Sequence, residues 1–147
     1  MRISEARRRP VVATESAQTI GRVDGFLIET EARRITGLRI DDVDGPGTVL
    51  PWDRMTAFGV DAITVPTAAA LRAPADAAET RRCDPDLDPI GKPAIEETGD
   101  SLGTVTDVEF DADTGAVRSV LTDAYDIPVD KLLGLGAYAV VFADLHR

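Results

Sequence analysis

Four carboxylates form the densest group of residues in the sequence that could do chemistry: Asp107, Glu109, Asp111 and Asp113. On a β-strand alternate side chains project from the same face, so the first three would stand about 7 Å apart. Two carboxylates at that spacing could serve as a general acid and a general base. The sequence indicates no desolvated pocket that would separate their pKa values, so we expect a solvated strand face. Weak binding of a divalent ion is the alternative.

A second acidic segment, Asp84-Pro-Asp-Leu-Asp-Pro, resembles the opening of a calcium-binding loop. In an EF-hand the sixth position is glycine and a carboxylate closes the twelfth. Here these positions hold Pro89 and Ile95, which cannot supply that geometry. We therefore expect a flexible acidic linker rather than a metal site.

Residues suited to nucleophilic, redox or metal chemistry are scarce. Cys83 is the only cysteine and His146 the only histidine, which excludes an internal disulfide, a cysteine-based metal site and a histidine-based triad within one chain. Gly21 and Gly103 lack the glycine-rich run and the Lys-Ser/Thr pair of a phosphate-binding loop. We expect no catalytic residue, no metal, no cofactor and no enzymatic activity.

Large apolar side chains near two proline residues are the candidates for binding a partner. Trp52 is the only tryptophan and directly follows Pro51. Packing in the core is one interpretation of Trp52, and an exposed aromatic anchor for a protein partner is the other. Three further residues in the corresponding segments would extend such a patch: Phe58, Leu135 and Tyr138.

Charge narrows the class of partner. The 147 residues include 26 acidic and 16 basic side chains, for a net charge of −10. A field of this sign repels phosphate backbones, so direct binding of nucleic acid is not expected. The basic clusters Arg7–Arg9 and Arg81–Arg82 could touch an acidic partner, but solvated charges are the simpler interpretation.

Hydropathy places the chain among proteins without a membrane span. The longest apolar stretches, such as residues 139–143, are far shorter than the roughly 20 residues of a spanning helix. No apolar run follows the charged N-terminus, as a secretory signal would require. We expect a cytoplasmic protein.

The elements that must position these residues form an internal repeat. Residues 9–15 and 92–98 each begin with a basic residue and proline, and each is followed by an Ile/Leu-Gly-x-Val segment. Residues 51–59 and 128–136 share a Pro-x-Asp opening and a closing glycine. Apolar positions between these marks coincide in order, which predicts two copies of one module.

Each copy has the pattern of β structure. Apolar residues alternate at Phe26/Ile28 and at Val108/Phe110, which is typical of a half-buried strand. In both copies the alternation slips by one residue just before this point, after Val23 and after the equivalent residue of the second copy. A shared slip predicts a β-bulge, which bends a strand so that a small barrel can close.

Turn signals connect these strands. The run Asp111-Ala-Asp-Thr-Gly-Ala predicts a turn with glycine at a positive φ angle. Its counterpart, Thr30-Glu-Ala-Arg-Arg, lacks the glycine, so we expect a different turn. Pro51 and Pro128 each predict one or two helical turns before a last strand.

Between the copies lies a polar, proline-bearing segment. Thr67 could cap a helix that Pro74 would end, and the remainder is interpreted as a linker. The expected boundaries are residues 1–68 for the first repeat, 69–88 for the linker and 89–147 for the second repeat. One such module is marginal alone, so we expect the halves to pack together about a pseudo-two-fold axis or on a second chain as a homodimer.

With these motifs in this order, both halves resemble the PRC-barrel family. The marks are the basic residue and Pro-Val start, the Ile/Leu-Gly-x-Val strand and the Pro-x-Asp ending. The resemblance implies an all-β fold of two tandem, small, strongly curved barrels, each with a short helical turn near its end. It also implies an adaptor role without catalytic residues, as in the photosynthetic reaction-centre H subunit and the ribosome maturation factor RimM.

Three functions follow as hypotheses. The first is a non-enzymatic adaptor or scaffold that binds an unidentified protein partner. The second is an accessory role in ribosome assembly or RNA processing like that of RimM, through a ribosomal protein. The third is binding of a small ligand or ion, which requires a concave pocket with convergent polar groups.

Overall fold

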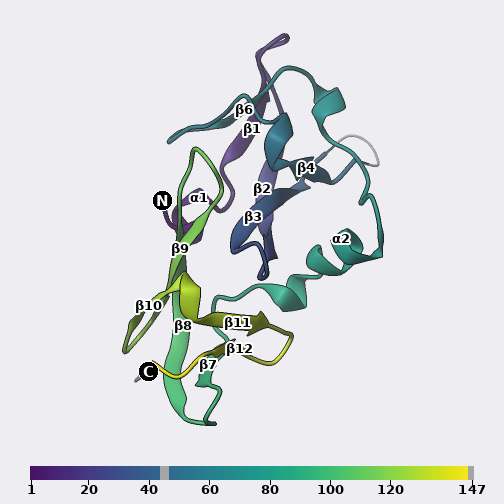
Figure 1. Ribbon diagram of the computed structural model, residues 1–147. Helices are drawn as coiled ribbons and strands as arrows, with labels where there is room; N and C mark the ends of the chain where they lie inside the picture. The colour runs from purple at the N-terminus through teal and green to yellow at the C-terminus, as the bar shows by residue number, and fades with distance from the viewer. Residues whose placement is uncertain (44–46, 146–147) are drawn as a thin grey trace.

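The computed structural model describes residues 1–43 and 47–145 and is mostly β (Figure 1). His146, the histidine considered in the sequence analysis, lies outside the described residues. Figure 1 shows the first sheet, in purple to teal, above the second, in green to yellow, with the connecting segment along one side. None of the helices in the described part of the chain is long and apolar enough to cross a membrane.

The first half forms a six-stranded sheet in the order β4-β3-β2-β1-β6-β5. Strands β1 and β6 are parallel and the other neighbours are antiparallel. Its elements are α1 (Ile3–Ala6), β1 (Pro10–Ala13), β2 (Gln18–Glu29), β3 (Arg34–Asp41), β4 (Val49–Pro51), the 3-10 helix η1 (Trp52–Arg54), β5 (Ala57–Phe58) and β6 (Ile63–Val65).

The second half has the same topology, with the order β10-β9-β8-β7-β12-β11 and one parallel pair, β7 and β12. This identity of strand order confirms the predicted repeat. Its elements are β7 (Pro93–Glu96), β8 (Ser101–Phe110), β9 (Val117–Thr122), β10 (Asp126–Pro128), the 3-10 helix η4 (Val129–Lys131), β11 (Leu132–Leu135) and β12 (Val140–Phe142).

The predicted bulge is present in both copies. The β2–β3 register shifts between Val23 and Gly25, and the β8–β9 register shifts between Val105 and Asp107. The predicted helical turns are also present as η1 and η4. The sequence missed the short strands β5 and β11 that follow them, because two to four residues carry too little alternation to be distinguished from a loop.

The two hairpin turns are more alike than their sequences suggested. Gly115 has the predicted positive φ of +78°. Arg33, at the equivalent place in the first repeat, adopts φ +55° although it carries a side chain. The backbone conformation is therefore retained without the glycine, at a cost in local strain. The closing hydrogen bonds do differ, because Arg33 N donates to Thr30 O and Gly115 N donates to Asp111 O.

These turns pair with each other and join the repeats. Ile35 N donates to Gly115 O over 2.7 Å, and Val117 N donates to Arg33 O over 2.9 Å. The two bonds involve equivalent residues in exchanged roles, as a pseudo-two-fold axis requires. Buried residues of both sheets belong to one hydrophobic cluster. The expected packing of the two halves on each other is confirmed.

The connecting segment is folded, so the prediction of a flexible acidic linker is wrong. It contains the 3-10 helix η2 (Ala68–Ala70), capped by Thr67 as predicted, then α2 (Ala77–Arg82) and the 3-10 helix η3 (Pro85–Leu87). An ion pair from Arg72 to Glu79 holds α2. The Arg39 guanidinium donates to Cys83 O over 2.6 Å, which ties the segment to β3. Charged side chains therefore hold the connecting segment in place.

Candidate functional site

The acidic row does not form the solvated face expected from the sequence. Asp107 is 7% exposed, and its carboxylate accepts hydrogen bonds from the backbone N–H and the hydroxyl of Ser4. It thereby fixes α1 of the first half against β8 of the second. Asp107 and Glu109 keep a regular register with β9, so Asp107 is buried because α1 packs over β8 at this point. A cover supplied from about 100 residues away leaves no mark on the local alternation.

Asp111 also has a structural role. Its carboxylate accepts from the backbone N–H groups of Asp113 and Thr114 and pairs with Arg118 at 2.8 Å. The pKa of Asp111 is lowered below its ordinary value. The largest cause is the hydrogen bond from the backbone N–H of Asp113, and the next is the hydrogen bond from Arg118. This carboxylate is held ionised and closes the hairpin turn, as turn aspartates commonly do.

Trp52 and Phe58 lie in the core between the repeats. Trp52 is 9% exposed, stacks on Phe58 with ring centroids 5.5 Å apart and meets the edge of Phe110 at 6.2 Å. Phe110 belongs to the second repeat, so the aromatic contact crosses the pseudo-axis. Core packing, one of the two interpretations of Trp52, is what the geometry shows.

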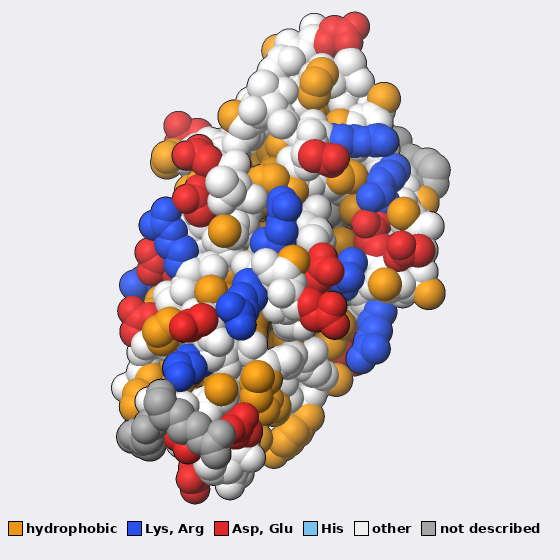
Figure 2. Space-filling model, viewed as in Figure 1, with side chains coloured by type: hydrophobic (Ala, Val, Ile, Leu, Met, Phe, Trp, Pro, Cys, Tyr) orange, Lys and Arg blue, Asp and Glu red, His pale blue; other side chains and the backbone are white. Residues whose placement is uncertain are grey.

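The other two candidates lie on the second repeat, near its edge strand β11. Leu135 is half-buried, whereas Tyr138 is 75% exposed in the β11–β12 hairpin. Figure 2 shows hydrophobic side chains gathered over this hairpin, while acidic and basic side chains alternate over much of the remaining face. The four candidate residues therefore do not share one patch.

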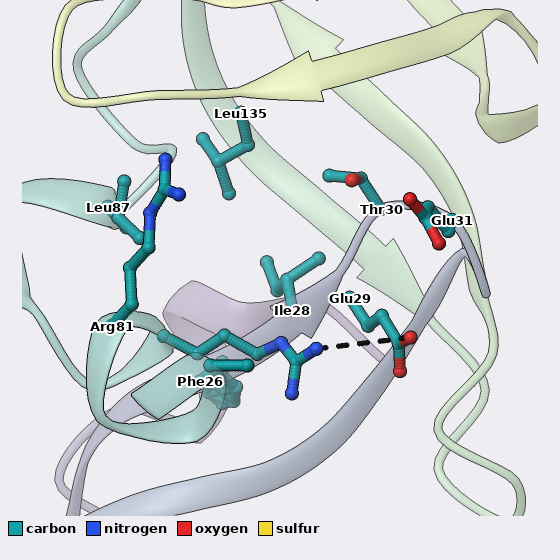
Figure 3. A pocket seen from close by; sticks show the side chains of 10 residues that line it. Phe26, Ile28, Glu29, Thr30, Glu31, Arg81, Leu87 and Leu135 are labelled. Carbon is teal, nitrogen blue, oxygen red and sulfur yellow. Dashed lines mark ion pairs between the residues drawn. The ribbon is translucent and has the colours of Figure 1, made fainter. Parts of the chain in front are cut away.

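A hollow of about 350 Å³ opens between β2, the connecting segment and β11 (Figure 3). We call it the inter-repeat pocket. Ten residues line it: Phe26, Ile28, Glu29, Thr30, Glu31, Ala78, Arg81, Arg82, Leu87 and Leu135. They come from both repeats and from the segment between them, so only the folded tandem arrangement creates this site. Its volume is within the range of pockets that bind small molecules or side chains of a partner.

The pocket has an apolar floor and charged walls. Figure 3 shows Ile28 and Leu135 pointing toward each other, with Arg81 on one side and Glu29 and Glu31 on the other. A guanidinium nitrogen of Arg82 lies 3.9 Å from a carboxylate oxygen of Glu29, at the limit of an ion pair. In the described part of the chain Arg81 has no ion-pair partner.

The pseudo-axis produces a second hollow of about 340 Å³ on the other side of the interface, which we call the twin hollow. Leu135 corresponds to Phe58, and the turn residues Thr30 and Glu31 correspond to Ala112 and Asp113. Its lining is Trp52, Asp53, Met55, Thr56, Ala57, Phe58, Ala112 and Asp113. It contains two carboxylates and no arginine or lysine, so it lacks the cationic wall that α2 supplies to the inter-repeat pocket.

One pattern in the sequence indicates the helix that carries the two arginines of this pocket. Asp76 caps α2 by accepting from Glu79 N over 2.8 Å, and an acidic residue three positions after a cap is a known helix-start pattern. That pattern would have placed Arg81 and Arg82 together in the last turn of a helix. Nothing in the sequence indicated that Arg39 would fasten this segment beside β2 through a backbone carbonyl.

Comparison with known proteins identifies the module. The model of the PRC-barrel domain matches residues 1–72 and 86–133. No curated protein matches the chain. Among the described residues, no group of three or more His, Cys, Asp and Glu side chains is placed to hold a metal ion.

Proposed function

Because the chain belongs to the PRC-barrel family, we propose that it is a non-enzymatic adaptor that binds a protein partner in the inter-repeat pocket. The observation that carries this proposal is the convergence of three separate segments on one apolar floor with charged walls. Such a pocket with a few placed polar groups is the usual form of a binding site.

Binding is supported by the arginines that line the pocket. The pocket lining includes arginines, glutamates, one threonine and apolar residues, but no histidine, cysteine or lysine. Arginine remains protonated at physiological pH and serves to hold anions rather than to transfer protons. These groups suit recognition of a complementary surface.

A protein partner is favoured over a free small molecule by the surroundings of the pocket. Strand β11 ends the order of its sheet and has β12 as its one strand neighbour in the described part of the chain, and an edge of this kind is where a partner strand can be added. Leu133 and Tyr138 beside it are 54% and 75% exposed. An extended segment on this edge would lie next to Leu135 of the pocket floor.

A matched pair of substitutions tests the proposal. Thr30→Trp fills the inter-repeat pocket, and Ala112→Trp places the same bulk at the equivalent position of the twin hollow. We expect affinity capture from the native cell, quantified by mass spectrometry, to recover the same partner with the wild-type chain and with Ala112→Trp. Recovery with Thr30→Trp should fall about tenfold or more, with thermal unfolding unchanged for both variants.

Other outcomes of this capture experiment would change the proposal. Equal recovery with both variants would contradict the pocket as the site. Capture of a ribosomal protein by the wild-type chain, lost with Thr30→Trp, would keep the pocket and place the adaptor in ribosome assembly. A small molecule that co-purifies with the wild-type chain and is lost with Thr30→Trp, without any protein, would replace the adaptor by a ligand-binding protein.

A further inference from the structure

We propose that the inter-repeat pocket selects a protein segment that presents an acidic side chain beside an apolar one, with the carboxylate paired to Arg81. This inference rests on the proposed function and names the chemistry of the partner. Arg81 and the apolar floor supply the two halves of the recognition.

Of the two arginines that line the pocket, Arg81 is the one without an ion pair among the described residues. Arg82 is partly neutralised by Glu29, 3.9 Å away. Arg72, which precedes α2 in the sequence, forms an ion pair with Glu79 of α2. Arg81 is exposed, lines the pocket and has no ion pair in the described part of the chain. A guanidinium presents several N–H donors in a plane that matches a carboxylate.

The floor sets what must accompany the carboxylate. Ile28, Leu135 and Leu87 line the space beside Arg81 (Figure 3), and all three are partly exposed. An apolar side chain seated there would remove this surface from water, which is the main favourable term in such contacts. A carboxylate adjacent to it in the partner would then lie against the α2 wall.

The opposite wall fixes the direction in which the segment lies. Glu31 faces Arg81 across the pocket in Figure 3 and also has no ion pair among the described residues. An acidic side chain on that wall would be repelled, whereas backbone N–H groups or a basic side chain would be attracted. The segment is therefore held with its acidic side toward α2.

Comparison with the twin hollow explains why an acidic segment would bind at only one of the two hollows. It has a similar volume, but its charged lining residues are Asp53 and Asp113. Both repel a carboxylate, and no segment equivalent to α2 covers this side. An acidic partner segment therefore distinguishes two hollows of similar volume that share three pairs of equivalent lining residues.

The experiment uses phage-displayed random dodecapeptides, selected on the folded full chain. The baits are the wild-type chain, Arg81→Glu and Arg54→Glu, in which Arg54 is an exposed arginine outside the pocket. We expect the wild-type and Arg54→Glu baits to enrich peptides with Asp or Glu next to a large apolar residue. Arg81→Glu should lose these peptides or enrich Lys or Arg at the acidic position.

A synthetic copy of the most enriched peptide then gives the magnitude. Replacing its acidic residue by Asn or Gln should weaken binding to the wild-type chain about tenfold, measured by fluorescence polarisation. The same replacement should change binding to Arg81→Glu by less than twofold, because the charge partner is then absent.

The outcomes separate this inference from the proposed function. The inference would be overturned if the peptides enriched on the wild-type chain lack acidic residues, or if Arg81→Glu enriches the same acidic peptides as the wild-type chain. If Thr30→Trp nevertheless fails to bind the enriched peptides, the pocket remains the binding site. Peptides that bind Thr30→Trp as well as wild type would overturn both. Failure of all three baits to enrich any peptide would also overturn the selection of a short segment.

Discussion

The inter-repeat pocket and the twin hollow occupy equivalent places but differ in chemistry. Around the twin hollow, Trp52 and Phe58 stack and contact Phe110 of the other repeat. Around the inter-repeat pocket, the equivalents are the smaller Val129, Leu135 and Ile28. The first side is built for packing between the repeats. The second side contributes an aromatic contact, from Phe26 to Phe110. It combines an apolar floor with arginines from α2, which has no equivalent in the twin hollow.

This difference shows how a duplicated module can divide stability from binding. A pseudo-two-fold axis gives two hollows with partly equivalent linings, and the connecting segment lines only one of them. Because α2 lies on that side, charge is added without disturbing the repeated core. The acidic chain, with its net charge of −10, thereby presents two arginines of α2 at the inter-repeat pocket and none at the twin hollow.

The largest effect should come from truncating the aromatic core. Phe110 is fully buried, whereas the equivalent Ile28 is half-buried at the pocket floor. We expect Phe110→Ala to lower the free energy of unfolding by about 3–5 kcal/mol and Ile28→Ala by less than about 2 kcal/mol. Urea unfolding followed by Trp52 fluorescence measures both. Equal losses would contradict the division between a packing side and a binding side.

A smaller effect is expected at the paired turns. A Cβ atom on Gly115 would lie 2.8 Å from Ile35 O and 3.0 Å from the Trp52 ring, and the residue has φ +78°. Gly115→Ala should therefore cost about 2 kcal/mol of stability. Arg33→Gly at the equivalent position should change stability by no more than about 0.5 kcal/mol, because relief of backbone strain offsets the added freedom of the unfolded chain.

Thermal unfolding of the two turn variants sharpens the comparison. A destabilised Arg33→Gly together with an unaffected Gly115→Ala would mean that the tight contact lies on the first repeat's turn instead.

The smallest effect should concern the ion pair that holds α2. The hydrogen bond from the Arg72 guanidinium is the largest cause of a lowered pKa for Glu79. A carboxylate whose pKa is depressed stabilises the fold at pH values above its ordinary pKa of 4.5, and this contribution is lost as the pH falls through the folded-state pKa. Glu79→Gln should therefore cost at most about 1 kcal/mol at pH 7.

The pH dependence supplies the control for that variant. The stability gap between wild type and Glu79→Gln should be largest above about pH 5 and shrink as the carboxylate protonates. Equilibrium urea unfolding from pH 7 to pH 3 measures the gap. A gap that is constant over this range would contradict a role for the ionised pair.

Much of the fold was predictable because the repeat doubles every local signal. The slips after Val23 and Val105 were informative because they occur at matching positions, and the turn glycine Gly115 was specific by itself. The burial of Asp107 was not predictable, because α1 covers it and its partner Ser4 lies 103 positions away in the sequence.

The candidate site was predictable only in part. Leu135 does line the inter-repeat pocket, but Trp52 is buried and Tyr138 is not among the lining residues. Arg81 and Arg82 were noted as a basic cluster, yet their position depends on long-range contacts such as that of Arg39 with Cys83 O. Local patterns carry no information on which surface a connecting segment will cover.

The central claim is that the inter-repeat pocket, and not its twin, receives the partner. A photoreactive benzophenone amino acid introduced at Thr30 or at Ala112, with irradiation in the native cell, tests it directly. The account predicts a cross-linked protein adduct from position 30 and little or none from position 112. Equal adducts from both positions, or an adduct from position 112 alone, would contradict it.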